Sequence, residues 1–236
     1  MSVSKNTAVY PEFKASIRRW LTPWKAYLDP YSKYQFVRSL NQPNAEILDI
    51  GCGVDSVRKL KALAPLAQFD GIDIEEYQMS EAGKRAMRTY SIVPKEDFFR
   101  HIQEGPQYDG MVLSHVIEHL DEPNRFLEML LGKLKPGGKL YVSTPCMKSV
   151  DFLALKRGCL NFYDDPTHTV PFDLEAWSKQ LPPGYQVSTQ TNQNRGHALV
   201  FMLGWIMMPW VWLTRRKTPF VWYAMGFESV LVVEGL

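Results

Sequence analysis

The residues with the clearest chemical meaning lie in the stretch ILDIGCGVDS, residues 47–56. An apolar run reaches Asp49 and then Gly51 and Gly53, which is typical of a buried strand that turns into a nucleotide-binding loop. Asp73 ends a second apolar run about 20 residues further on, where a carboxylate can accept hydrogen bonds from both ribose hydroxyls. A glycine pair also occurs in ordinary strand-to-helix turns, and an aspartate also serves as a helix cap. The two features therefore indicate a cofactor site only in combination.

Asp55 stands where many such loops carry a third glycine. A carboxylate there would repel the pyrophosphate of a dinucleotide, which binds against the loop and the helix N-terminus. S-adenosylmethionine carries no phosphate but has a sulfonium and an ammonium group, so Asp55 favours this cofactor over NAD. Alternatively, Asp55 simply caps the helix that we expect to begin at Ser56.

The elements that must position these residues alternate between strands and helices. Apolar runs that end in turns predict four buried strands, at 46–51, 68–74, 108–117 and 139–145. Helical spacing and stop signals predict helices at 56–65, 80–90 and 122–138. This alternation predicts right-handed βαβ units and a parallel sheet, in which ligands bind beyond the carboxyl ends of the strands. Gly51, Asp73 and Ser114 fall at such ends.

Four motifs together resemble the class I S-adenosylmethionine-dependent methyltransferases. They are ILDIGCG (47–53), GIDI (71–74), YDGMVLSHVIEHLDEP (108–123) and LKPGGKLYVSTP (134–145). The resemblance implies a Rossmann-like α/β fold, with a seven-stranded, mostly parallel sheet, helices on both faces and an antiparallel last strand. It implies one methyltransferase domain over 1–236, with a helical lid at 1–42, a cofactor-binding core at 43–145, an acceptor-binding and apolar region at 146–220 and the final strand at 221–236.

The same resemblance implies roles for individual residues. Gly51 and Gly53 would approach the methionyl part of the cofactor, and Asp49 would brace the loop. Asp73 would bind the ribose, while Asp97 and Phe98 would flank the adenine and Ser114 and His115 would line the far side. The implied cofactor-binding residues are Asp49, Gly51, Cys52, Gly53, Asp73, Ile74, Asp97, Phe98, Ser114 and His115. We interpret Glu118 and His119 as a partly buried, hydrogen-bonded pair.

Candidate acceptor-binding residues lie in NFYDDPTHTVPF, residues 161–172, after the expected fifth strand. Methyl transfer to a hydroxyl needs alignment of the acceptor and gains from a general base that removes the proton. We predict His168 as this base and Asp165 as the residue that orients it; the alternative is a hydrogen-bonded structural turn. Further candidates for contact with the acceptor are Tyr31, Tyr163 and Arg195.

The segment ALVFMLGWIMMPWVWL, residues 198–213, has no charged residue, and the basic residues 215–217 follow it closely. It is shorter than the roughly 20 residues that span a bilayer, and Pro209 interrupts it. Three interpretations remain open. The segment is a buried strand and helix in the core, a peripheral membrane contact over 198–217 with tryptophans at the headgroups, or a dimer interface.

Composition narrows the class of protein. The chain has 236 residues and a net charge of +2, which does not favour nucleic-acid binding. Its three cysteines form neither a disulfide framework nor a CxxC pair, so we expect no metal and a reducing, cytoplasmic compartment, with membrane association on the cytoplasmic face as an option. The N-terminus lacks the apolar core of a signal peptide.

We therefore expect an S-adenosylmethionine-dependent O-methyltransferase that releases S-adenosylhomocysteine. Its acceptor would be a glycan, a lipid-linked sugar or another small hydroxylated molecule. One alternative is a methyltransferase of quinone or lipid precursors, whose prenyl tail would bind the apolar segment. Another is a non-catalytic, cofactor-binding regulatory protein. The sequence leaves the oligomeric state open.

Overall fold

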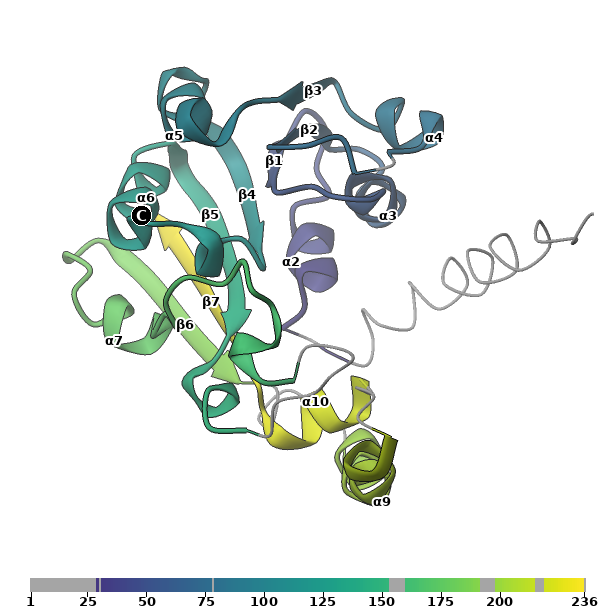
Figure 1. The fold of residues 1–236 in the computed structure, drawn as a ribbon. Coiled ribbons are helices and arrows are strands. Elements are labelled where there is room, and N and C mark those ends of the chain that lie inside the picture. Colours follow the sequence, from purple (N-terminus) through teal and green to yellow (C-terminus); the bar gives the residue numbers. More distant parts are fainter. Residues whose placement is uncertain are drawn as a thin grey trace, which may run out of the picture.

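Seven strands form one sheet in the order β3-β2-β1-β4-β5-β7-β6 (Figure 1). The computed structural model describes residues 29, 31–77, 79–152, 160–191, 198–214 and 219–235. The strands are β1 (Glu46–Ile50), β2 (Gln68–Asp73), β3 (Thr89–Ile92), β4 (Tyr108–Ser114), β5 (Leu134–Pro145), β6 (Tyr185–Thr191) and β7 (Glu228–Gly235). Strands β1 to β5 pair in parallel, and β7 is antiparallel to both β5 and β6. The predicted mostly parallel sheet with an antiparallel last strand is confirmed.

Helices cover both faces of the sheet (Figure 1). On one face lie α2 (Lys33–Ser39) and α3 (Ser56–Leu63), and on the other lie α5 (Lys95–Glu104), α6 (Pro123–Leu131) and α7 (Leu174–Ser178). In α6, Pro123 starts the helix, and the apolar stripe that faces the core contains Phe126, Leu127, Leu130 and Leu131. Burial of such stripes against the apolar strands forms one hydrophobic core on each face of the sheet. Short elements complete the chain: α4 (Glu81–Lys84) and the 3-10 turns η1 (Ile117–His119), η2 (Met147–Ser149) and η3 (Phe162–Asp164).

Several predicted boundaries are wrong, among them the end of the strand predicted at 108–117, which ends at Ser114 before η1. Helix α6 ends at Leu131, because Leu134 already pairs with Tyr108 and the KPGG segment lies within β5 at a register shift. The predicted helix 80–90 is only α4, since the chain from Thr89 pairs with β2 as strand β3, and α5 then follows. The segment 221–236 is not wholly strand, because helix α10 (Pro219–Met225) precedes β7.

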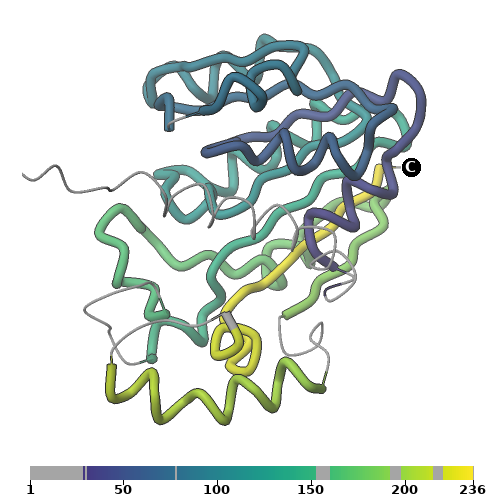
Figure 2. Tube along the Cα trace, turned by 90° about the vertical axis from the view of Figure 1, so that its right-hand side faces the viewer, coloured from purple at the N-terminus to yellow at the C-terminus, as the bar shows by residue number. Residues whose placement is uncertain are grey.

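The apolar segment forms helix α9 (Ala198–Thr214), which lies at the outer edge of the molecule on α10 (Figures 1 and 2). A side chain at Gly204 would overlap Ala224 and the carbonyl of Phe220, so the two helices pack closely there. Only Gly204 and Val211 of α9 are buried, so the core interpretation of this segment is wrong. Its exposed large apolar side chains are Leu199, Phe201, Met202, Trp205, Ile206, Trp210, Trp212 and Leu213. Among the described residues, no helix has the length and apolar character to cross a bilayer.

A buried carboxylate joins β2, β3 and β4. Asp70 accepts two hydrogen bonds from the guanidinium of Arg88, at 2.6 and 3.1 Å, and one from the hydroxyl of Tyr108 at 3.1 Å. Burial raises the pKa of Asp70, but the hydrogen bonds and charge of Arg88 outweigh it and lower the pKa below its ordinary value. A lowered carboxyl pKa stabilises the fold above the unfolded value of about 4, and this stabilisation is lost as the pH falls through the folded value.

We expect Arg88→Met to lower the free energy of unfolding by about 2 kcal/mol at pH 7, because Asp70 then keeps a buried charge without its cation. The decrease in the free energy of unfolding between neutral and acid pH should also be smaller in this variant than in the wild type. Urea unfolding at several pH values measures both effects. Lys84→Met is the matched control, since Lys84 pairs with Glu76 at the surface, and it should change stability by less than about 0.5 kcal/mol. Equal effects of the two substitutions would contradict the role of Asp70.

Candidate cofactor and acceptor site

An open cavity of about 810 Å³ lies at the carboxyl ends of the parallel strands. Six predicted cofactor residues line it: Gly51, Gly53, Asp73, Ile74, Phe98 and His115. The loop after β1, the end of β2, the first turn of α5 and the end of β4 thus meet at one edge of the sheet, which is where such sheets bind ligands.

The glycine loop needs its glycines for geometry. Gly51 and Gly53 have φ of 69° and 47°, in the left-handed region that glycine adopts without strain. A side chain at Gly51 would also overlap Val116, which lines the cavity. Asp73 holds this loop, because its carboxylate accepts the N–H of Gly53 at 2.7 Å and that of Ile74 at 2.8 Å.

Two predicted cofactor residues lie beneath the loop rather than on the cavity wall. Asp49 is 1% exposed, and its Oδ2 is a buried oxygen without a hydrogen-bond partner in the described part of the chain. Burial raises the pKa of Asp49, and the nearby ammonium of Lys33 opposes this shift. Cys52 is fully buried, and desolvation raises its thiol pKa to about 12, so it is a packing residue and not a nucleophile.

Asp55 turns away from the cavity. Its Oδ1 accepts the N–H and the hydroxyl of Ser80, at 3.2 and 2.6 Å, and its Oδ2 pairs with Arg58 at 3.2 Å. It makes no side-chain cap to α3; instead it braces Ser80, which caps α4. The cap explanation is therefore wrong, because the helix that the Asp55 side chain supports is α4 and not α3. The charge on which the argument for S-adenosylmethionine depended is paired with Arg58.

Two more expected cofactor residues lie off the cavity wall. Asp97 is half-buried on the first turn of α5 and pairs with Arg100 at 2.7 Å. Ser114 bonds the hydroxyl of Ser143 on β5 at 3.0 Å. The structure adds wall residues that were not predicted to line the site: Glu75, Tyr77, Lys95, Phe99, Thr167 and His119, which we had interpreted only as the partner of Glu118. Glu75 and Phe99 adjoin predicted site residues, which is a usable signal, whereas nothing in the sequence marked Tyr77 or Lys95.

His115 links the cavity wall to the last strand. Its φ is 58°, and its Nδ1 and Nε2 lie 3.2 Å from Glu118 Oε1 and 2.9 Å from Glu228 Oε1. Desolvation by the surrounding protein would lower the pKa of His115, whose side chain is 43% exposed, but the hydrogen bonds and charges of the two glutamates raise it to about 10. Trp222 of α10 lies beside the ring, at 6.3 Å between centroids. His115 is therefore a cation at neutral pH, held by two carboxylates.

The expected acceptor loop meets the site through η1. His119 lines the cavity, and its Nδ1 donates to the carbonyl of Thr167 at 3.1 Å. His168 lies behind it with ring centroids 4.8 Å apart, and its Nδ1 donates to the carbonyl of Phe162 at 2.6 Å. Asp165 does not orient His168 by a hydrogen bond as we expected, because its Oδ2 is 4.0 Å from Nε2.

The remaining predicted acceptor contacts are not brought to the cavity. Tyr163 on η3 is 60% exposed and Tyr31 is 39% exposed, and neither lines the cavity wall. Arg195 and the first part of the predicted lid, residues 1–28, lie outside the described residues.

The fold and the cavity define a Rossmann-like α/β protein with a nucleoside-type cofactor site at its strand ends. A family model described as a methyltransferase domain matches residues 17–183, and the chain belongs to this family. It is a methyltransferase that depends on S-adenosylmethionine, as the four motifs predict.

Curated relatives are distant. The ubiquinone biosynthesis O-methyltransferase of Marinobacter nauticus is 25% identical over 185 residues, which cover 73% of this chain and 74% of that protein. That of Bordetella avium is 26% identical over 161 residues, or 61% of this chain and 63% of that protein.

Among solved structures, a SAM-dependent methyltransferase from Archaeoglobus fulgidus has a TM-score of 0.56 at 18% identity and covers 96% of this chain and 99% of its own. The plantazolicin methyltransferase BpumL, in complex with SAH, has a TM-score of 0.54 at 16% identity, with coverage of 97% and 92%. At identities this low, the TM-scores show that the fold is shared and nothing more.

We expect His115 to remain protonated across the neutral range and to titrate near pH 10 in nitrogen-15 NMR spectra of its ring. A raised histidine pKa stabilises the fold below the unfolded value of about 6.5, and this stabilisation is lost as the pH rises through the folded value. Glu228→Gln should lower the pKa of His115, because one of the two carboxylates is removed. Glu234→Gln, on the same strand but paired with Lys139, is the control and should leave it unchanged. A His115 that titrates near 6.5 would contradict this assignment.

Proposed function

We propose that this methyltransferase transfers a methyl group to an oxygen of a small hydroxylated acceptor. The observation that carries this proposal is the shared cavity: the glycine loop and Asp73 line one part of it, and His119 and Thr167 line another. A quinone precursor is favoured over a glycan, because the relatives in Marinobacter nauticus and Bordetella avium are named for ubiquinone biosynthesis.

The cavity suits a positively charged cofactor. Four carboxylates line it, those of Asp73, Glu75, Asp121 and Glu122, against the two cationic side chains of Lys95 and His115. Asp73 would bind the ribose, and the backbone of Gly51 and Gly53 would receive the methionyl end. Phe98 would pack against the adenine, since it is an apolar residue of the cavity wall on α5. When bound, S-adenosylmethionine supplies a methyl group that is already activated toward nucleophiles.

His119 is the residue that we propose as proton acceptor. It lines the cavity, whereas His168, our prediction from sequence, lies behind it with a side chain that is only 8% exposed. Nδ1 of His119 lies 3.1 Å from the carbonyl of Thr167 and 3.0 Å from its hydroxyl. The carbonyl can only accept and the hydroxyl donates to Asp165, so the ring proton is on Nδ1 and Nε2 keeps a lone pair. That lone pair can take the proton of the acceptor hydroxyl while His168 packs against the ring and positions it.

We expect His119→Gln to lower kcat for methyl transfer by about 100-fold, in the range of a lost general base, without weakening cofactor binding. Incorporation of labelled methyl groups into a cell-envelope extract measures the rate, and calorimetry with S-adenosylhomocysteine measures cofactor affinity. His168→Gln should cost less than about 10-fold, because His168 does not reach the cavity. His101→Gln, an exposed histidine on α5, is the control. If the rate of methyl transfer falls more in His168→Gln than in His119→Gln, the base is His168, as the sequence predicted, and not His119.

Helix α9 supports an acceptor that is drawn from a membrane. The helix carries no charged residue and exposes eight large apolar side chains, including Trp205, Trp210 and Trp212. Tryptophans of this kind partition to the headgroup region of a bilayer, and the basic residues 215–217 that follow in the sequence suit an anionic lipid surface. Through α10 this surface adjoins the site, because Trp222 lies beside His115. We therefore propose that α9 lies in the interface of a membrane that holds the acceptor.

We expect the protein to float with vesicles that contain phosphatidylglycerol and the double variant Trp210→Ser/Trp212→Ser to float less, because each exposed indole removed takes away apolar contact with the bilayer. Leu66→Ser is the control, since it removes an exposed apolar side chain between α3 and β2, far from α9 along the chain. Light scattering without lipid tests the dimer alternative. A wild-type dimer that dissociates in the double variant, with no flotation of either protein, would favour the dimer interface over the membrane.

A further inference from the structure

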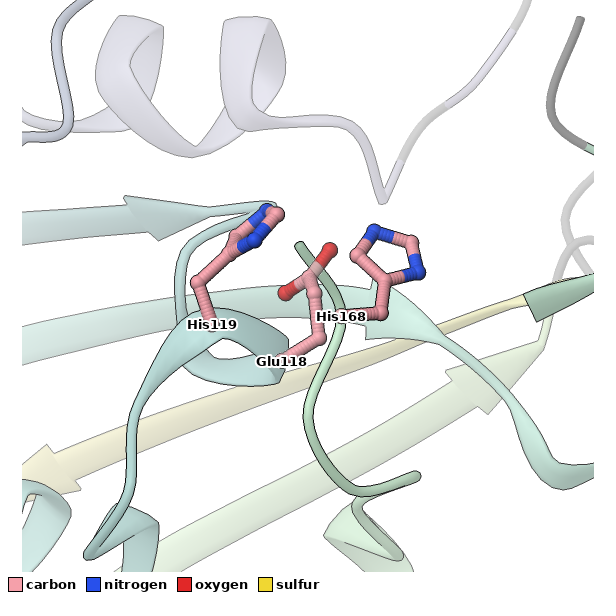
Figure 3. A group of neighbouring side chains, drawn as sticks. All are labelled: Glu118, His119 and His168. Carbon is pink, nitrogen blue, oxygen red and sulfur yellow. The ribbon is translucent and has the colours of Figure 1, made fainter. Parts of the chain in front are cut away.

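The side chains of Glu118, His119 and His168 lie close together (Figure 3), and His119 lines the cavity. One potential ligand atom from each residue lies within 4.8 Å of those of the other two. Glu118 is fully buried, and the two histidines are partly buried. Two imidazoles and one carboxylate are a donor set that binds zinc and similar transition metals.

The hydrogen bonds around these imidazoles match those that orient metal ligands. His119 donates its Nδ1–H to the carbonyl of Thr167, and His168 donates its Nδ1–H to the carbonyl of Phe162. In both rings the lone pair is therefore on Nε2, the nitrogen that is free to bind a cation. In Glu118, Oε1 accepts from His115 and Oε2 accepts from Thr144 at 3.2 Å each, which leaves further lone pairs on both oxygens.

The backbone holds the two segments together. Thr169, next to His168, donates its N–H and its hydroxyl to the carbonyl of Glu118 at 2.8 and 3.0 Å. These bonds join the acceptor loop to η1, although some fifty residues separate them in the sequence. Asp165 adds a second carboxylate, with Oδ2 at 4.0 Å from Nε2 of His168. The cluster therefore combines fixed imidazoles with more than one negative charge.

We propose that Glu118, His119 and His168 bind one divalent transition-metal ion, with zinc as the representative ion. Ligand atoms about 2.1 Å from a tetrahedral zinc ion lie roughly 3.4 Å from one another. Side-chain rotations that move each ligand atom by on the order of 1 Å would bring the three atoms to this separation. His119 lines the cavity, so the fourth position of the metal is on the side open to water. This site departs from our expectation that the chain binds no metal.

Metal binding has a consequence that rests on the proposed function. The ion occupies Nε2 of His119, the same lone pair that we propose as the proton acceptor, so a ring that holds zinc cannot remove the acceptor's proton. Zinc bound at this cluster therefore inhibits methyl transfer.

Cobalt titration of the full chain tests the site without any acceptor. We expect one equivalent of Co²⁺ to give the visible absorption of a tetrahedral site with nitrogen and oxygen ligands, and Zn²⁺ to displace it. His119→Gln and His168→Gln should each weaken Co²⁺ binding at least about 10-fold, while His101→Gln on α5 leaves it unchanged. Absorption from thiolate ligands, no absorption, or equal binding by all variants would overturn the proposed site.

The inhibitory consequence is tested separately, with each variant compared with its own zinc-free rate. Methyl transfer by the wild type and by His101→Gln should fall with Zn²⁺ at the concentration that displaces Co²⁺. His168→Gln should resist that concentration, because it keeps His119 but loses a metal ligand. Inhibition of His168→Gln equal to that of the wild type would overturn the link between this cluster and catalysis. If zinc binds at the cluster but activates or does not inhibit the wild type, the metal site stands and the proposed role of His119 as base fails.

Discussion

The buried carboxylate of Glu118 is the constraint on which the acceptor side of the site depends. A charge without solvent is costly unless hydrogen bonds and opposite charges compensate it. Glu118 obtains this compensation from His115 at the end of β4 and from Thr144 on β5, while its backbone carbonyl holds Thr169 of the acceptor loop. His115 in turn is fixed by Glu228 at the start of β7. One buried charge therefore determines how four segments meet.

The cofactor side depends on a comparable arrangement around Asp73. Its carboxylate accepts the N–H groups of Gly53 and Ile74 and so holds the glycine loop against the end of β2. Asp55 extends this support to α4 through Ser80, without facing the cavity. Both sides use the same physics, because each carboxylate is satisfied by donors from neighbouring segments. Three of the residues that face these carboxylates, Gly53, Ile74 and His115, line the cavity.

The position of β7 connects these features to the apolar surface. Because β7 enters the sheet antiparallel between β5 and β6, the helices that precede it are delivered to the carboxyl edge of the parallel strands. Helix α10 therefore borders His115, and α9, which packs on α10, forms the exposed apolar edge of the molecule (Figures 1 and 2). A site for chemistry and a surface suited to lipid are adjacent as a result of this one topological feature.

The sequence by itself determined the fold class and most of the cofactor loop, because strand runs, glycine turns and Asp73 are local signals that depend on neighbours along the chain. It missed β3 and the true end of α6, since pairing with β2 and β4 overrides local helical spacing there. Only the tertiary structure decided that Asp55 supports α4, that His119 rather than His168 lines the cavity, and that α9 is exposed. These outcomes depend on contacts between segments up to tens of residues apart, and such contacts leave no periodic signal in the sequence.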